Sequence, residues 1–324
     1  MFALLRRTGR LSLVKFGLRV PSFPVDGSSA KTFVNQILGF LKELEENYSS
    51  AWVDDHFVPW LTSIPKATPN LESFTSISYL AGVFQKLTFG NIVLCNSYRN
   101  PATLAKMAAT LQTLTHGRFV LGIGAGWKED EYIAYGYEFP SPRARVGQLE
   151  EGVQIIRRMW TEETVTFKGR YYTVDQAYCE PKPKPVPPVM IGGGGEKLTL
   201  RVVARYADWW NLPNVSPETY QHKLAVLKEH CRREGRDSAE IAKTLGSNVA
   251  IAETDKEARR LAVDSPFINM ENEESFVIGD PARVSEKLRE YIRLGVELFI
   301  LRFVDFPKTD GAKLFAEKVI PAFT

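Results

Sequence analysis

The stretch that most constrains the fold of this chain spans residues 99–127. Pro101 suits the first turn of a helix, where its missing N–H costs nothing, and apolar residues then recur at helical spacing as far as Leu114. Gly117 follows as a C-terminal stop signal. The apolar run at 119–123 is typical of a strand that is covered on both faces. The stretch therefore predicts a helix and a buried strand, the repeating unit of α/β proteins.

Glycines occupy the far end of this predicted strand. Gly122, Gly124 and Gly126 remove side chains there, so another group can approach the backbone closely. The spacing lacks the third glycine of the dinucleotide-binding fingerprint. Because α/β enzymes place ligands at the carboxyl ends of parallel strands, we interpret the glycines as room for a ligand.

The same alternation continues along the chain. Strands are predicted at 14–20, 51–57, 91–96, 119–123, 189–192, 207–211, 245–250 and 298–303, each followed by a helix. Alternation implies parallel strands, and eight of them in 324 residues favour a (β/α)8 barrel over an open sheet. Residues 161–188 interrupt the rhythm with a predicted hairpin, turning at Lys168–Gly169, and a proline-rich run. We interpret this segment as an excursion between the fourth helix and the fifth strand, because the alternation resumes directly after it.

Composition narrows the class of protein. The 41 basic and 38 acidic residues give a net charge of +3, which is too even to indicate nucleic acid or a membrane surface as partner. No apolar run reaches transmembrane length. Cys95, Cys179 and Cys231 are too far apart for a disulfide framework or a metal cluster. We therefore expect a cytoplasmic protein without a metal.

The N-terminal residues 1–14 are basic and only weakly apolar. They lack the long apolar core and the small-residue cleavage site of a targeting signal. We expect them to form a disordered extension, and residues 15–324 to form a single barrel domain.

Three residues at the exit of the second predicted strand are candidates for chemistry. His56 is preceded by Asp55, and a histidine at a strand end can hold or donate a proton. Trp60 could offer a flat wall to a planar ligand. The alternative is structural: His56 would complete a buried hydrogen-bond network and Trp60 would pack on the surface.

Two further features point to the same end of the barrel. Four glycines at 192–195 precede a predicted helix, and their N–H groups could cradle a phosphate. No Lys-Ser/Thr follows them, which excludes a nucleotide-hydrolysing P-loop, and a flexible loop is the alternative. Arg302 interrupts an otherwise apolar last strand, so it must point to the barrel mouth or find a partner.

Several segments together resemble the bacterial-luciferase-like superfamily, and within it the members that depend on coenzyme F420. They are RNPATLAKMAATLQTLTHGRFVLGIGAGWKEDEYIAYGYEF, RARVGQLEEGVQIIRRMW, FKGRYYTV, PPVMIGGGGEKLTLRVVARYADWWN and IGDPARVSEKL. The resemblance covers most of the chain from Lys15 onward. It implies a luciferase-like (β/α)8 TIM barrel that binds a flavin or 5-deazaflavin at the carboxyl ends of the strands.

The resemblance also implies roles for individual residues. The motif DHFVPW resembles that of the deazaflavin sugar-phosphate dehydrogenases and places His56 and Trp60 beside the reactive ring as catalytic residues. The strand-three exit corresponds to a backbone bulge that supports the ring, often through a non-proline cis peptide. The cofactor-binding residues implied are Asp55, Cys95, Asn96, Gly124, Ala125, Gly126, Gly192, Gly193 and Gly194.

The chain also departs from the pattern of those relatives. Trp127 stands where the sugar-phosphate dehydrogenases have a catalytic glutamate, which argues against a sugar-phosphate substrate. Gln112 and Thr115–His116 differ at a helix end, away from the predicted mouth. The segment 264–278, which often helps to close the substrate pocket, is short.

We expect an oxidoreductase that moves a hydride between F420, favoured over FMN, and a small organic substrate. An FMN-dependent monooxygenase supplied by a partner flavin reductase and a non-catalytic flavin-binding barrel are the alternatives. A homodimer is expected from the resemblance.

Overall fold

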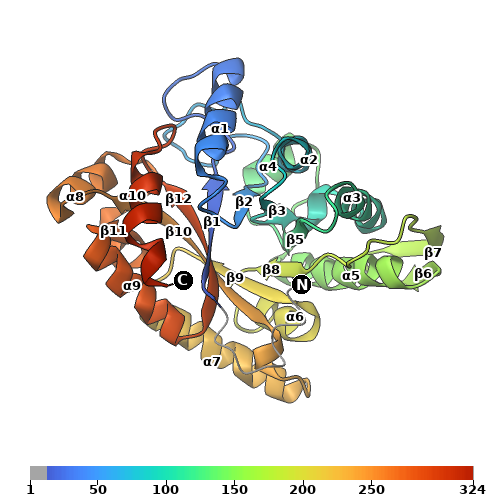
Figure 1. Ribbon diagram of the computed structural model, residues 1–324. Coiled ribbons are helices and arrows are strands. Elements are labelled where there is room, and N and C mark those ends of the chain that lie inside the picture. Colours follow the sequence, from blue (N-terminus) through green and yellow to red (C-terminus); the bar gives the residue numbers. More distant parts are fainter. Residues whose placement is uncertain (1–12, 324) are drawn as a thin grey trace.

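The computed structural model describes residues 13–323 and contains a closed barrel of parallel strands (Figure 1). The barrel strands are β1 (Lys15–Val20), β2 (Ser50–Val53), β3 (Thr88–Asn91), β5 (Phe119–Gly124), β8 (Val189–Gly192), β9 (Trp209–Pro213), β10 (Ala242–Ile251) and β12 (Val296–Phe303). Each pairs in parallel with the next, and β12 pairs with β1 to close the ring. The predicted (β/α)8 barrel is confirmed.

Helices surround the barrel on its outside (Figure 1). They are α1 (Ala30–Leu44), α2 (Ser73–Val83), α3 (Pro101–Leu114), α4 (Glu129–Ala134), α5 (Pro142–Thr161), α6 (Thr199–Tyr206), α7 (Pro217–Arg233), α8 (Asp255–Asp264), α9 (Pro281–Arg293) and α10 (Asp310–Lys318). Residues 99–127 form the predicted helix and strand. Pro101 is the first residue of α3, and the Asn100 side chain caps the helix by accepting hydrogen bonds from the N–H groups of Ala102 and Thr103.

The predicted excursion is an antiparallel hairpin of β6 (Thr164–Lys168) and β7 (Thr173–Tyr178). It projects from the barrel beyond α5 (Figure 1). The chain also forms β11 (Val277–Gly279), which pairs with β10 outside the ring. The sequence analysis missed this strand because three residues carry no readable alternation.

The prediction for the third strand is wrong in position. The strand was predicted at 91–96, but β3 ends at Asn91. The chain then continues through a cis peptide between Ile92 and Val93 into the short β4 (Leu94–Cys95). Of the four residues of β3 (TFGN) only Phe89 is large and apolar, so no apolar run marks the strand in the sequence. A Cβ at Gly90 would overlap the indole of Trp52, so the missing side chain lets Trp52 fill the barrel. The second strand likewise ends at Val53 and not at residue 57.

The barrel interior is packed and not open. Its side chains form one apolar cluster of Trp52, Ile92, Val120, Met190, Trp209, Ala242, Leu298 and Ile300, with Val93 partly buried against it. A second, larger cluster fills the space between strands and helices. Close packing of this kind stabilises the barrel and supports the side chains that lie at its mouth, the carboxyl ends of the strands.

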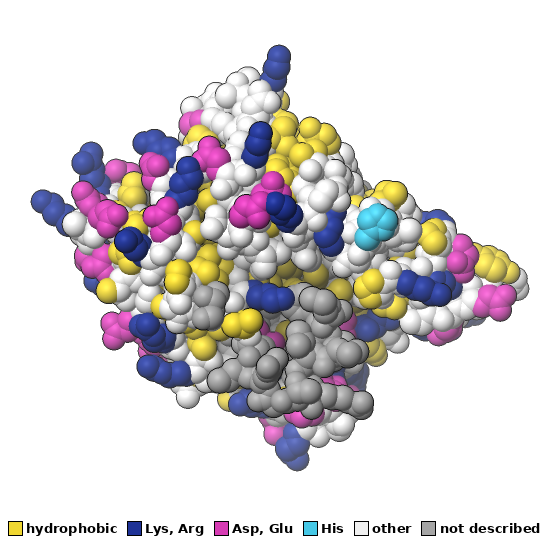
Figure 2. Space-filling view, viewed as in Figure 1, with side chains coloured by type: hydrophobic (Ala, Val, Ile, Leu, Met, Phe, Trp, Pro, Cys, Tyr) yellow, Lys and Arg dark blue, Asp and Glu magenta, His cyan; other side chains and the backbone are white. Residues whose placement is uncertain are grey.

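Apart from Leu13 and Val14, the expected N-terminal extension lies outside the described residues. Within residues 13–323, no helix combines the length and the hydropathy that a bilayer crossing requires. The same residues contain no cluster of three potential metal ligands. On the face in view in Figure 2, basic and acidic side chains are interspersed.

Candidate active site

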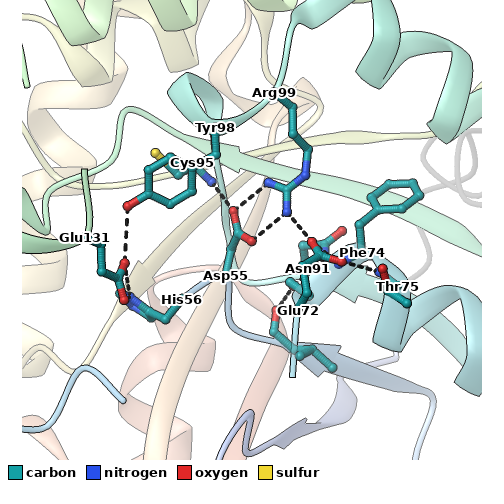
Figure 3. Close-up of polar contacts among 12 residues, drawn as sticks. Asp55, His56, Glu72, Phe74, Thr75, Asn91, Cys95, Tyr98, Arg99 and Glu131 are labelled. Atoms are coloured by element: carbon teal, nitrogen blue, oxygen red, sulfur yellow. Dashed lines mark hydrogen bonds and ion pairs between the residues drawn. The ribbon is translucent and has the colours of Figure 1, made fainter. Parts of the chain in front are cut away.

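The loop after β2 carries three consecutive polar residues, Asp54, Asp55 and His56, and each has a different partner. Asp54 accepts a hydrogen bond from Arg19 Nε at 2.7 Å and also contacts Arg302. Asp55 pairs with a different arginine, and His56 pairs with a glutamate (Figure 3). Three separate polar clusters therefore begin at the end of one strand.

His56 is held by Glu131, a residue of α4 that is 1% exposed. The imidazole Nδ1 lies 3.0 and 3.1 Å from the two carboxylate oxygens. A carboxylate only accepts hydrogen bonds, so Nδ1 carries the hydrogen and Nε2 is the nitrogen left for a ligand. Tyr98 Oη, 3.2 Å away, donates to the same carboxylate. Burial, with the charge of Glu131, raises the pKa of Tyr98 and keeps its hydroxyl a donor.

Two tryptophans flank His56. Its ring centroid lies 6.3 Å from Trp60 and 5.7 Å from Trp127. Trp60 also packs against Phe23 and Phe267, and its Nε1 is buried without a hydrogen-bond partner among the described residues. The structure thus brings His56 and Trp60 together, as predicted, and leaves a donor on Trp60 for a ligand.

Asp55 belongs to a structural network in which its oxygens are occupied. Arg99 donates from both terminal nitrogens to the two carboxylate oxygens, each at 2.8 Å, and the Cys95 N–H adds a third bond at 2.8 Å (Figure 3). Arg99 also contacts Glu72, which caps α2. Burial lowers the pKa of Arg99, but the two carboxylates outweigh it and hold the pKa above its ordinary value. Asp55 therefore fixes the chain after the cis peptide, and its contact with a cofactor stays a prediction.

Val93 lies against two of the predicted cofactor-binding glycines. A Cβ on Gly124 would lie 2.8 Å from a Val93 methyl, and one on Gly192 would lie 2.9 Å from the other. Gly126 has a similar function, because a Cβ there would overlap Tyr132 Oη. These glycines make room first for the protein's own groups, and Val93 forms an apolar floor at the mouth.

Cys95 and Ala125 contact the same tyrosine. Tyr132 Oη lies 2.9 Å from Cys95 Sγ and 3.3 Å from the Ala125 carbonyl. Burial raises the pKa of the Cys95 thiol to about 11, so it is neutral at physiological pH. Both residues support the mouth from below, and their contact with a cofactor stays a prediction.

The Asn96 side chain has a partner within the protein, and its contact with a cofactor stays a prediction. The side chain donates from Nδ2 to Tyr172 Oη at 3.0 Å. Its Oδ1 packs against Gly152 of α5, where a Cβ would overlap it. The amide therefore packs against α5 and Tyr172, and its Oδ1 is buried without a hydrogen-bond partner among the described residues. The sequence pattern located the bulge but could not show which way the side chain turns.

The glycine loop differs from the predicted cradle. The helix begins at Thr199, not directly after the glycines. The Gly193 N–H is used by the Asn211 carbonyl at 3.0 Å. A Cβ on Gly194 would lie 3.8 Å from Lys223 Cε of α7, and a Cβ on Gly195 would lie 2.8 Å from Thr199 Oγ1 of α6. A phosphate site built on this loop would have Lys223 beside Gly194, with its Nζ paired to Glu196 Oε1 at 2.6 Å. The predicted binding of a phosphate by Gly192, Gly193 and Gly194 stays a prediction.

Sequence reasoning missed Glu131, Tyr98 and Arg99. Glu131 was hidden in the acidic run KEDE, which is typical of an exposed helix start. The structure shows that this turn of α4 faces inward, because the adjacent Tyr132 is fully buried. That burial could not be inferred from the acidic run. Arg99 and Tyr98 were hidden because their partners are more than 25 residues away in sequence.

The barrel and its mouth define an oxidoreductase of the luciferase-like superfamily. The chain matches the sequence model of the luciferase-like monooxygenase family over residues 14–275 and belongs to that family. It is 29% identical to an F420-dependent glucose-6-phosphate dehydrogenase of Kineococcus radiotolerans over 75% of this chain and 73% of that one. It is 34% identical to F420-dependent glucose-6-phosphate dehydrogenase 2 of Rhodococcus jostii, over 71% and 69% of the two chains. Among solved structures, an F420-dependent secondary alcohol dehydrogenase in complex with an F420–acetone adduct superposes with a TM-score of 0.81 at 21% identity, covering 96% and 99% of the chains.

Proposed function

We propose that this oxidoreductase uses coenzyme F420 to transfer a hydride to or from a small organic substrate at the barrel mouth. The observation that carries the proposal is His56, whose Nδ1 is held by the buried Glu131 and whose ring is flanked by Trp60 and Trp127. The names of the relatives support F420 as the cofactor.

The residues at the mouth fit a deazaflavin. Trp60 Nε1 is a buried donor without a partner among the described residues, and a ring carbonyl would satisfy it. Val93 offers a partly exposed apolar surface for a planar ring. Gly194, Gly195 and Lys223 would hold the phosphate.

When bound, the deazaflavin accepts or supplies the hydride. The chain's own contribution is to orient the reactants and to move the proton that accompanies the hydride. Glu131 fixes the tautomer of His56, so that Nε2 can accept a proton from a substrate hydroxyl or hold one near a carbonyl oxygen. Trp60 walls the mouth and limits access of water to this nitrogen.

A sugar phosphate is not the substrate we propose. Position 127, directly after the glycine strand end, carries a tryptophan that is 62% exposed. This indole offers an apolar face and no carboxylate at that point of the mouth.

The test is to titrate the purified protein separately with F420 and with FMN while following fluorescence. We expect saturable binding of F420, and bleaching of its absorbance when a panel of small alcohols is added. Tight binding of FMN with no binding of F420 would overturn the choice of cofactor and favour the FMN-dependent monooxygenase.

A further inference from the structure

Arg302 is a buried charge that the mechanism above does not use. It lies on β12 and is 1% exposed. Alternate residues of a strand share a face, and Leu298 and Ile300 belong to the interior cluster, so Arg302 points into the barrel above them. Its position in an apolar strand predicts that this side chain points to the mouth or finds a partner. In the structure it has a partner for only part of its donors.

Arg302 has fewer partners than its donors require. One terminal nitrogen, Nη2, contacts Asp54. Its Nε and Nη1 are buried and have no hydrogen-bond partner among the described residues. Phe267 lies 4.5 Å and Trp60 5.9 Å from the guanidinium carbon. Aromatic rings attract a cation but cannot replace the acceptors that a planar guanidinium needs.

A second arginine increases the excess of positive charge. Leu18 of β1 pairs with Leu301 of β12, so the next residues, Arg19 and Arg302, are neighbours at the mouth. Both contact Asp54, one on each carboxylate oxygen. Two cations therefore share one anion, and the uncompensated charge is buried. A buried charge of this kind is costly unless something pairs with it.

We propose that Arg302 and Arg19 bind a carboxylate or phosphate group of the substrate, which makes the substrate of this enzyme a small organic anion. The free Nε–H and Nη1–H groups lie on different edges of the guanidinium, and each can donate a charge-assisted hydrogen bond to an oxygen of such an anion. The proposal rests on the proposed function. Trp60 contacts both Arg302 and His56, so the indole of Trp60 lies between the anion site and the residue that transfers the proton. That spacing requires a substrate of few carbons between its anionic group and its reacting carbon.

The first arm of the test uses the cofactor-free protein at low ionic strength. Acetate and inorganic phosphate are titrated while tryptophan fluorescence and thermal unfolding are followed, with acetamide as the neutral match for acetate. We expect saturable binding of acetate or phosphate and none of acetamide. Arg302→Met should weaken the binding at least about tenfold, the range for a charge-assisted hydrogen bond.

The matched control is Lys66→Met, which removes one positive charge from an exposed ion pair with Asp130. We expect this variant to bind the anion as the wild type does. Arg302→Lys keeps the charge without the planar donors, and it should also bind about tenfold more weakly; it serves if the methionine variant does not fold. Absence of saturable binding to the wild type, or equal binding by the Arg302 variants, overturns the proposal.

The second arm asks whether the anion belongs to the substrate or to the cofactor. F420 is titrated into the wild type and the Arg302 variant. Equal affinities assign the site to the substrate, whereas a matching loss of F420 affinity assigns it to the cofactor and overturns the proposal. If the wild type binds no F420, the proposed function fails, while the anion titration still gives its own answer.

Discussion

Asp54 and Asp55 are adjacent in sequence, but their environments at the mouth are opposite. Asp55 and Glu72 place two carboxylates around one arginine, and Asp55 accepts three hydrogen bonds at 2.8 Å. Asp54 is shared by two arginines, and one of them keeps two buried donors without partners among the described residues. The comparison separates a network that fixes the backbone from a cluster that is ready to bind a ligand. Satisfied groups position the chain, and the leftover donors indicate where a ligand binds.

The first prediction breaks the Asp55 network. Arg99→Met should lower the free energy of unfolding by about 3–5 kcal/mol, because it leaves the buried Asp55 carboxylate without its cation. Denaturant unfolding followed by circular dichroism measures the change. The matched control is Arg158→Met, which removes an exposed helical pair with Glu162 and should cost no more than about 0.5 kcal/mol. Equal costs for the two variants would show that the Asp55 network is not structural.

The second prediction concerns the third residue of the loop. His56→Ala should lower kcat about 100-fold or more, the range for loss of a general acid–base group, with the Kd for F420 unchanged. The control is His116→Ala, an exposed histidine that follows α3, which should keep full turnover. Unchanged turnover in the His56 variant would remove this residue from the mechanism.

The third prediction separates positioning from contact. Glu131→Gln can still accept a hydrogen bond from Nδ1 but loses the charge that stabilises a protonated imidazole. We expect kcat to fall about tenfold while KM and the Kd for F420 stay constant. A change in KM or Kd with constant kcat would mean that Glu131 shapes the pocket and does not act through His56.

The sequence predicted the barrel because strand–helix alternation is a local pattern. It also identified His56 and Trp60, which lie on one short motif, and the constraint on Arg302. It could not show Glu131 with His56, or Arg19 with Arg302, because these pairs form only when distant strands close the ring. It misplaced the third strand, whose sequence TFGN has one large apolar residue and a glycine that leaves space for Trp52. It assigned Gly124 and Gly192 to a ligand, which stays a prediction, and it could not show that Val93 packs against both glycines.

The smallest expected effect, that of Arg302→Met on stability, distinguishes the Asp54 cluster most clearly from the Asp55 network. Arg302→Met should change the free energy of unfolding by less than about 1 kcal/mol at neutral pH, although Arg302 is more buried than Arg99. Asp54 keeps Arg19 as its cation, and the variant removes a charge that the fold does not fully pair. Burial and the charge of Arg19 lower the pKa of Arg302 to about 10. Because the folded pKa lies below that of the unfolded chain, folding disfavours the protonated form at every pH below this value, and methionine removes that cost. If Arg302→Met lowered the free energy of unfolding by about 3–5 kcal/mol, as expected for Arg99→Met, the Asp54 cluster would be a structural network like that of Asp55.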